Sequence, residues 1–194
     1  SNFPSEFVHE TLGILWSNGG AYGTWWASNP EEIHGINWLP FHGGSFYLGH
    51  IPEYIDKNYS ELTSNNGGVE QEWKDLVWQF QSFSKPEESV RKFERNKNYT
   101  PEKGTSKAFT YHWIHNLNTL GHVDTTIHCN IPTYACFVKK NTRTYIAFNP
   151  TIKPCTVTFS DEKKITLRKM ELKAETASIT AKNKKQKLLK KNKK

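Results

Sequence analysis

Residues 25–49, WWASNPEEIHGINWLPFHGGSFYLG, bring indoles, adjacent carboxylates, histidines and side-chain amides into one short segment. Flat aromatic side chains cover the C–H faces of a pyranose ring, while carboxylates and amides hydrogen-bond its hydroxyl groups. A site with both kinds of group suits a glycan better than an apolar metabolite. The segment therefore predicts a carbohydrate-binding cleft, with the candidate contacts Trp25, Trp26, Asn29, Glu31, Glu32, His34, Asn37 and Trp38.

Glu31 and Glu32 are the obvious candidates for acid–base chemistry. Hydrolysis of a glycosidic bond needs two carboxyl groups on opposite sides of that bond, roughly 5 to 9.5 Å apart. Sequence neighbours project about 100° apart on a helix, or to opposite faces of a strand, so these two cannot form the pair. At most one faces the cleft. The preceding Asn29-Pro30 equally indicates the first turn of a helix, where either acid has a structural role.

The aromatic residues of this region could belong to the core or to a binding surface. Any single tryptophan is more often a core residue than a platform for a ligand. A plain core, however, would use Leu and Val, so five large aromatics among glycines and polar residues favour a binding surface. The wall that we expect consists of Trp16, Tyr22, Trp25, Trp26 and Trp38.

No strong pattern in the chain indicates a metal, a cofactor or a nucleophile. His112 and His115, three apart on the last predicted helix, could share a face and a metal, but a surface or core pair is the preferred interpretation. His34, His42 and His50 recur at intervals of eight, which matches no metal-ligand spacing. The sequence contains neither a Gly-x-Ser-x-Gly motif nor a glycine-rich phosphate loop. We therefore expect no metal and no cofactor, and a binding surface rather than a reaction centre.

The net charge of +7 comes from the end of the chain. Residues 181–194, AKNKKQKLLKKNKK, hold eight lysines and no acid, and without them 18 basic residues face 19 acidic ones. Such a run predicts a solvated, disordered tail. The hypothesis that this is a nucleic-acid-binding protein would depend on the tail alone. No run of about 18 apolar residues indicates a membrane span. We expect neither nucleic acid nor a membrane as a partner.

The chain has three cysteines, Cys129, Cys136 and Cys155, which match no zinc spacing. One interpretation is that all three are buried thiols. A single disulfide, joining Cys136 to either of the others, is the alternative for a secreted protein.

Apolar periodicity predicts helices followed by hairpins. Spacings of three and four indicate helices over 52–62, 70–83 and 106–120, and Ser84-Lys85-Pro86-Glu87 has the form of a capping box for a helix that reaches about residue 96. After residue 122 the period becomes two, with hairpins at 133–149 and 155–167. The fold class is mainly α with a small antiparallel β part, as a helical bundle or toroid followed by two β-hairpins.

A longer set of motifs carries a family resemblance. It includes Phe3-Pro4, TLGILW from Thr11, the whole of 22–49 with its NPEEIHGINWLP core, Pro52-Glu53-Tyr54, Trp73-Lys74-Asp75, TYHWIHNLNTLGHVD, AFNP and TFSD. These segments resemble the C-terminal part of glycoside hydrolase family 81, the laminarinase-type endo-β-1,3-glucanases. The resemblance covers nearly everything up to about residue 172.

The resemblance implies a partial (α/α)6 toroid with accompanying strands, and hydrolysis of internal β-1,3 bonds with inversion. It implies that the general acid and general base lie upstream, in a His-Asp-Pro region and an Asn-Gln-Glu-Ser-Ser-Ser-Glu region, neither of which occurs in this chain. We therefore expect no catalytic residue here, and β-1,3-glucan and a missing N-terminal part of the same enzyme as partners. An extracellular or cell-wall location is expected, although no signal is visible.

The expected organisation has three parts: toroid helices over 1–127, a hairpin segment over 128–172, and a Lys-rich disordered tail over 173–194. A non-catalytic β-glucan-binding module that kept the aromatic wall is the alternative function.

Overall fold

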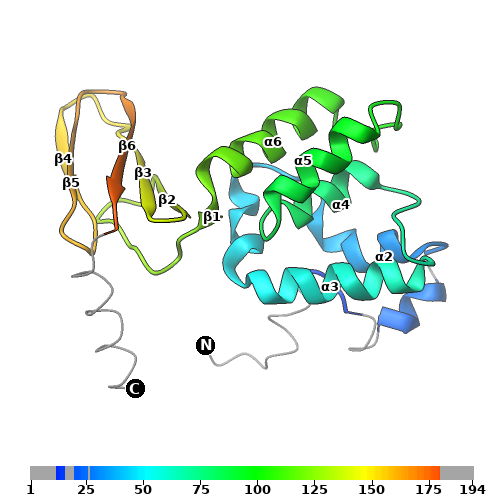
Figure 1. Cartoon of the computed structure of the whole chain (residues 1–194). Helices are drawn as coiled ribbons and strands as arrows, with labels where there is room; N and C mark the ends of the chain where they lie inside the picture. The colour runs from blue at the N-terminus through cyan, green and yellow to red at the C-terminus, as the bar shows by residue number, and fades with distance from the viewer. Residues whose placement is uncertain (1–11, 16–19, 26, 180–194) are drawn as a thin grey trace, which may run out of the picture. The chain divides into compact units, whose positions relative to one another are not determined.

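The computed structural model describes residues 12–15, 20–25 and 27–179, and the chain divides into two compact units. The first unit, Ser1–Thr119, is helical, and the second, Leu120–Lys194, is built of strands (Figure 1). The mixed helical and antiparallel β composition agrees with the prediction. The boundary at Leu120 lies earlier than the expected division after residue 127. None of the described helices is both long and apolar enough to cross a membrane.

The helical unit combines short 3-10 segments with longer α-helices (Figure 1). The described elements are η2 (Gly20–Trp25), α2 (Pro30–Gly35), η3 (Ile36–Trp38), η4 (Gly43–His50), α3 (Pro52–Asn65), α4 (Lys74–Gln81), α5 (Pro86–Arg95) and α6 (Lys107–Leu120). Helix α4 packs on α3 and α5, and α2 packs on α3 and α4. Pro starts α2, α3 and α5, which suits its fixed φ and its missing N–H.

Two of the predicted helices begin later than expected. Helix α4 starts at Lys74 rather than near residue 70, because Trp73 adopts a left-handed conformation with φ 47°. The capping box predicted at Ser84 is wrong: the residue before α5 is Lys85, which makes no side-chain cap. The Ser84 hydroxyl instead donates to Asp56 Oδ1 at 2.8 Å, so it ties the α4–α5 connection to α3.

Aromatic side chains, in stacked and edge-to-face pairs, form the core of the helical unit. Trp38 lies over Phe80 of α4 with ring centroids 4.0 Å apart. Trp113 of α6 contacts a further set of rings at centroid distances of 5.4 to 5.7 Å, namely Phe41, Phe46, Phe83 and Phe109. Such ring pairs add roughly 0.5–1.5 kcal/mol each to the free energy gained from burial alone. They fix α6 against η4 and against the segment that follows α4.

Gly121 ends α6, as predicted. Its φ is +89°, and a Cβ at this position would lie 2.2 Å from the carbonyl oxygen of Val138. Only glycine fits where the chain turns from the helix into the first strand.

Six described strands form two antiparallel sheets in the second unit (Figure 1). The four-stranded sheet has the order β1 (His122–Val123), β2 (Tyr134–Lys139), β3 (Thr142–Phe148), β6 (Leu172–Ser178), and the other sheet pairs β4 (Cys155–Thr158) with β5 (Lys164–Leu167). Both predicted hairpins are present. Strand β6 corrects the expected tail, because residues 173–178, assigned to that tail, pair with β3 along its length.

The inward faces of the two sheets share one apolar core. It consists of Ile127, Cys136, Tyr145, Ala147, Val157, Phe159, Ile165 and Leu167. The three cysteines are free thiols in this structure, so neither disulfide considered from the sequence is formed.

Candidate carbohydrate-binding site

Helix α2 carries the centre of the predicted cleft, and Asn29 begins it. The Asn29 side-chain oxygen accepts a hydrogen bond from the backbone N–H of Glu32 at 2.9 Å. This is the bond of an N-cap residue, and Pro30 follows at the first helical position. The half-buried Asn29 amide is thus already engaged in starting the helix.

Glu31 points into the protein and has no exposed surface. Its Oε1 accepts backbone hydrogen bonds from Gln71 at 2.7 Å and from Glu72 at 3.2 Å. A carboxylate that satisfies two peptide N–H groups stabilises the backbone around it. In this arrangement Glu31 joins α2 to the segment before α4 and does not face solvent.

His34 and Trp38 are also fully buried. Burial lowers the pKa of His34, although a hydrogen bond to Asn58 acts in the opposite direction, so the imidazole is neutral at pH 7. The Trp38 indole Nε1 donates to the carbonyl of Leu12 at 3.3 Å. Both residues pack α2 and η3 against the chain segment 12–15.

Gly13 allows this close packing. It has φ +125°, and a Cβ there would lie 2.7 Å from Trp38 Nε1 and 2.9 Å from Asn58 Nδ2. The next residue, Ile14, donates its backbone N–H to the carbonyl of His34 at 3.0 Å. Segment 12–15 therefore lies directly against the end of α2.

The outward-facing candidates are Trp25, Glu32 and Asn37. Trp25, the last residue of η2, is 84% exposed, and η2 packs beside α2. Glu32 is half-buried, and its Oε2 accepts the backbone N–H of Ser28 at 3.3 Å. Asn37 is exposed. Trp16 and Trp26 lie outside the described residues, as does the side chain of Tyr22.

The structure thus separates the seven described candidates into two groups, and the eighth, Trp26, lies outside the described residues. Glu31, His34 and Trp38 lie inside the helical unit, whereas Trp25, Asn29, Glu32 and Asn37 retain exposed surface. Adjacent Glu31 and Glu32 point to different surroundings, as expected for neighbours on a helix. Among the described residues no group of three or more His, Cys, Asp or Glu side chains could hold a metal ion.

One hollow of the helical unit was missed by the sequence reasoning. It has a volume of about 500 Å³ and follows directly on the candidate segment, because Leu39, Pro40 and Phe41 form part of its wall. Leu76, Phe109 and residues 103–106 complete the lining. The helical period placed Phe109 in the core, yet its ring is 36% exposed. The continuation of the candidate segment through Pro40 was the available sequence signal.

Comparisons with known proteins agree with the resemblance. The Glycosyl hydrolase family 81 C-terminal domain matches residues 1–114. A glucan endo-1,3-beta-D-glucosidase from Thermobifida fusca is 43% identical over 166 residues, covering 85% of this chain and 22% of that protein. One from Acetivibrio thermocellus is 36% identical over 177 residues, covering 91% of this chain and 23% of that protein.

A solved structure matches as well. It is a mutant of glycoside hydrolase family 81 from Clostridium thermocellum, with a TM-score of 0.75 and 38% identity over 79% of this chain and 21% of the other. The chain therefore spans less than a quarter of the length of these relatives. On the evidence of both sequence and structure, the chain belongs to glycoside hydrolase family 81.

Proposed function

We propose that this chain is the C-terminal part of an endo-β-1,3-glucanase and that it supplies glucan-binding residues to the complete enzyme. The observation that carries the proposal is family membership together with relatives named as glucan endo-1,3-beta-D-glucosidases. The described helices would then form part of an (α/α)6 toroid. An extracellular or cell-wall location belongs to the same proposal, since β-1,3-glucan is a polymer.

The proposed reaction is hydrolysis of internal β-1,3 bonds with inversion. A protonated carboxyl assists the leaving oxygen while a carboxylate on the opposite face of the sugar activates water. Glu31 and Glu32 cannot supply this pair, because one is buried and holds backbone N–H groups while the other lies on a different face of α2. The expected upstream motifs would supply it, so the 194-residue chain alone should be inactive.

The residues proposed to contact glucan are those with exposed surface. The Trp25 indole would cover the C–H face of a glucosyl ring, and the Glu32 carboxylate and Asn37 amide would bond its hydroxyl groups. Asn29 would contribute mainly by starting α2. Glu31, His34 and Trp38 would act by holding these groups in place.

The test begins with the 194-residue chain and laminarin-derived oligosaccharides. We expect binding by calorimetry and no release of reducing sugar. Trp25→Ala should weaken binding by roughly tenfold, since stacking on an indole contributes about 1 kcal/mol or more. Tyr111→Ala, which also removes an exposed ring but from α6, is the matched control. Hydrolysis by the chain alone, or equal binding by Trp25→Ala and wild type, would contradict the proposal.

A non-catalytic glucan-binding module is the second candidate, favoured by the exposed indole and by the missing catalytic motifs. Expression together with the upstream coding sequence separates the two. Laminarin hydrolysis by the longer protein, lowered by Glu32→Gln without loss of folding, is the outcome expected for the enzyme. Binding without hydrolysis would identify the module.

A further inference from the structure

The segment Glu70–Glu72, which leads into α4, is hydrogen-bonded to α2. Glu31 Oε1 accepts the backbone N–H groups of Gln71 at 2.7 Å and Glu72 at 3.2 Å. The Glu31 side chain is inaccessible to solvent, so these bonds do not compete with water. Glu31 is 40 residues away from Gln71 in sequence, so the contact is a tertiary one.

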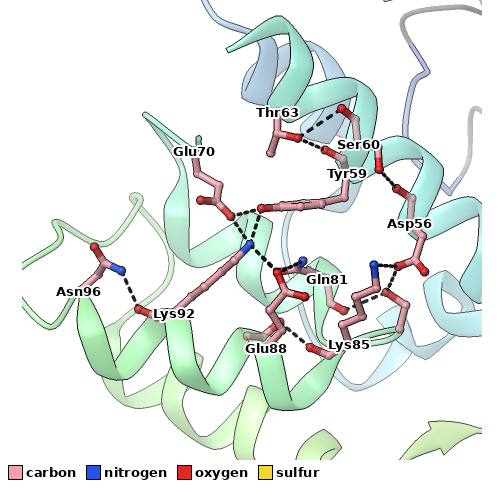
Figure 2. A network of polar contacts seen from close by, with 12 residues as sticks. Asp56, Tyr59, Ser60, Thr63, Glu70, Gln81, Lys85, Glu88, Lys92 and Asn96 are labelled. Atoms are coloured by element: carbon pink, nitrogen blue, oxygen red, sulfur yellow. Dashed lines mark hydrogen bonds and ion pairs between the residues drawn. The ribbon is translucent and has the colours of Figure 1, made fainter. Parts of the chain in front are cut away.

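The same segment is also bonded to α3 and α5 through the Glu70 side chain (Figure 2). Glu70 Oε1 accepts hydrogen bonds from Lys92 Nζ of α5 and from the Tyr59 hydroxyl of α3, both at 2.6 Å. Lys92 Nζ also donates to Gln81 Oε1 of α4 at 3.0 Å and lies 3.4 Å from Glu88 Oε1. In Figure 2 the Lys92 ammonium group lies at the centre of this set of oxygen atoms.

The charged groups of this cluster are largely shielded from solvent, so their hydrogen bonds contribute to stability. The exposed fractions of the Lys92 and Glu70 side chains are 20% and 13%. Burial alone would raise the pKa of Glu70, but hydrogen bonds from Lys92 and Tyr59 hold it below its ordinary value. Burial and the Glu70 carboxylate raise the pKa of Tyr59, so its hydroxyl keeps the proton that it donates. Glu70 is therefore ionised and doubly bonded at neutral pH.

We infer that Glu31 and the Glu70–Lys92 ion pair together clamp the Glu70–Glu72 segment and thereby fix the orientation in which α2 presents Glu32. The three clamp residues are positioning residues. None of them is among the residues proposed to touch glucan. The role in glucan binding rests on the proposed function, whereas the mechanical coupling of α5 to α2 through residues 70–72 does not.

Amide hydrogen exchange in the 194-residue chain tests the coupling. Lys92→Met removes the ammonium group and keeps most of the apolar stem. We expect exchange about tenfold faster at Gln71 and Glu72, and also at Glu32 and Ile33 in α2, because the segment loses a charge-assisted hydrogen bond. Unchanged exchange in α2, or an equal acceleration throughout α6, would overturn the inference.

Lys97→Met is the matched control. Lys97 follows α5 and pairs with Glu94 at 2.7 Å, but both side chains are largely exposed. It should leave exchange in α2 unchanged. If Lys92→Met does not fold, Tyr59→Phe gives the same comparison, because it removes one donor to Glu70 and keeps the ring; about threefold faster exchange at Gln71 and Glu32 is then expected.

Two substitutions of Glu31 separate its hydrogen bonds from its bulk. Glu31→Leu removes the acceptor, whereas Glu31→Gln keeps an oxygen that can accept both N–H groups. Exchange at Gln71 and Glu72 should accelerate in the leucine variant, and the glutamine variant should retain most of the protection. Equal behaviour of the two variants would show that Glu31 does not act through its acceptor oxygen.

Glucan binding forms a separate arm of the experiment. If the wild-type chain binds laminari-oligosaccharides, Glu31→Leu should weaken binding several-fold and Glu31→Gln should not. Faster exchange with unchanged affinity would overturn the positioning role. If the wild-type chain binds no glucan, the proposed function fails, and the exchange data still decide whether the clamp exists.

Discussion

Arg143 is a buried cation held between two carboxylates in the strand unit. Its Nε and Nη2 bond Asp124 Oδ2 at 2.9 and 2.8 Å, and its Nη1 bonds Asp161 Oδ2 at 2.8 Å. Hydrogen bonds from Thr126 and the nearby Arg143 hold the pKa of Asp124 below its ordinary value despite burial. Tyr145 completes the set by donating to Asp161. This network joins β3 to the β1–β2 connection, which carries Asp124, and to the β4–β5 turn, which carries Asp161.

Asp124→Asn should destabilise the strand unit. The amide keeps the shape of the carboxylate but removes one of the two negative charges that face Arg143, while Asp161 remains. Because leaving a buried charge wholly unpaired costs about 3–5 kcal/mol, losing one of two partners should cost roughly 2 kcal/mol. Urea unfolding followed by a signal from the strand unit measures the loss. Lys173→Met, which removes a half-buried and solvent-accessible partner of Glu175, should change stability by less than about 1 kcal/mol. Equal effects of the two substitutions would contradict this account.

Gly13 is a second residue whose substitution should lower stability markedly. Gly13→Ala should cost about 2 kcal/mol or more, because the new methyl group meets Trp38 and Asn58 at a φ that L-residues rarely adopt. Gly67→Ala is the matched control, since Gly67 has φ +69° but nothing within 4 Å of the added Cβ. The decrease in Tm should be clearly smaller for Gly67→Ala than for Gly13→Ala. Equal decreases would show that contact with Trp38 and Asn58 is not the cause.

At the scale of elements, the three cysteines differ in burial. Cys136 lies on β2 and points into the core, whereas the other two thiols lie nearer to solvent. Burial raises the pKa of the Cys136 thiol to about 12, whereas Cys129 and Cys155 are half-buried. Since the thiolate is the reactive form, Cys136 should resist an aromatic disulfide reagent at pH 8 until the chain unfolds. Titration should give two accessible thiols in the native protein and three in denaturant. Cys136→Ala is the control, and it should leave the native count unchanged.

Sequence periodicity located most elements because their apolar residues recur with a clear period. Helices α3 and α6 and both hairpins follow this rule. Strand β6 does not, since its half-buried positions are Lys173, Glu175 and Ala177. The two charged residues pair with each other at 3.0 Å, and Glu175 pairs with Lys163 at 2.6 Å. A strand at a sheet edge that uses charges in this way offers no apolar alternation to detect.

The sequence predicts a binding segment at residues 25–49, but it does not predict which of the side chains there are buried. The mix of residue types in 25–49 indicated a binding segment, and helix geometry required Glu31 and Glu32 to differ. Which of them would be buried depended on the backbone donors of Gln71 and Glu72, 40 and 41 residues away. Local sequence carries no information about such partners, so His34 and Trp38 were likewise expected in the cleft although they lie in the core.

At the scale of the whole molecule, stability should fall as the solution is acidified. Burial lowers the pKa of His34 below its ordinary value of 6.5, so below that pH the unfolded chain binds a proton that the folded chain does not. The lowered pKa values of Glu70 and Asp124 act in the same direction at lower pH, below their ordinary values of 4.5 and 3.8. Burial raises the pKa of Asp75, which opposes this trend in acid.

The prediction is a lower free energy of unfolding at pH 5.5 than at pH 7.5. For His34 alone the difference cannot exceed about 1.4 kcal/mol, which is the value of one pH unit below the unfolded pKa. Urea unfolding followed by helical circular dichroism at both values provides the measurement. A flat profile over this interval would mean that His34 gains a proton in the folded state.

The described indoles differ sharply in their surroundings, and this has a practical consequence. Trp25 is 84% exposed, while Trp38, Trp78 and Trp113 are buried among other rings. A water-exposed indole emits at longer wavelength and is open to collisional quenchers such as iodide. The difference in fluorescence emission between the wild-type chain and Trp25→Phe therefore gives the signal of Trp25. That signal should change when an oligosaccharide binds at η2, so no attached dye is needed.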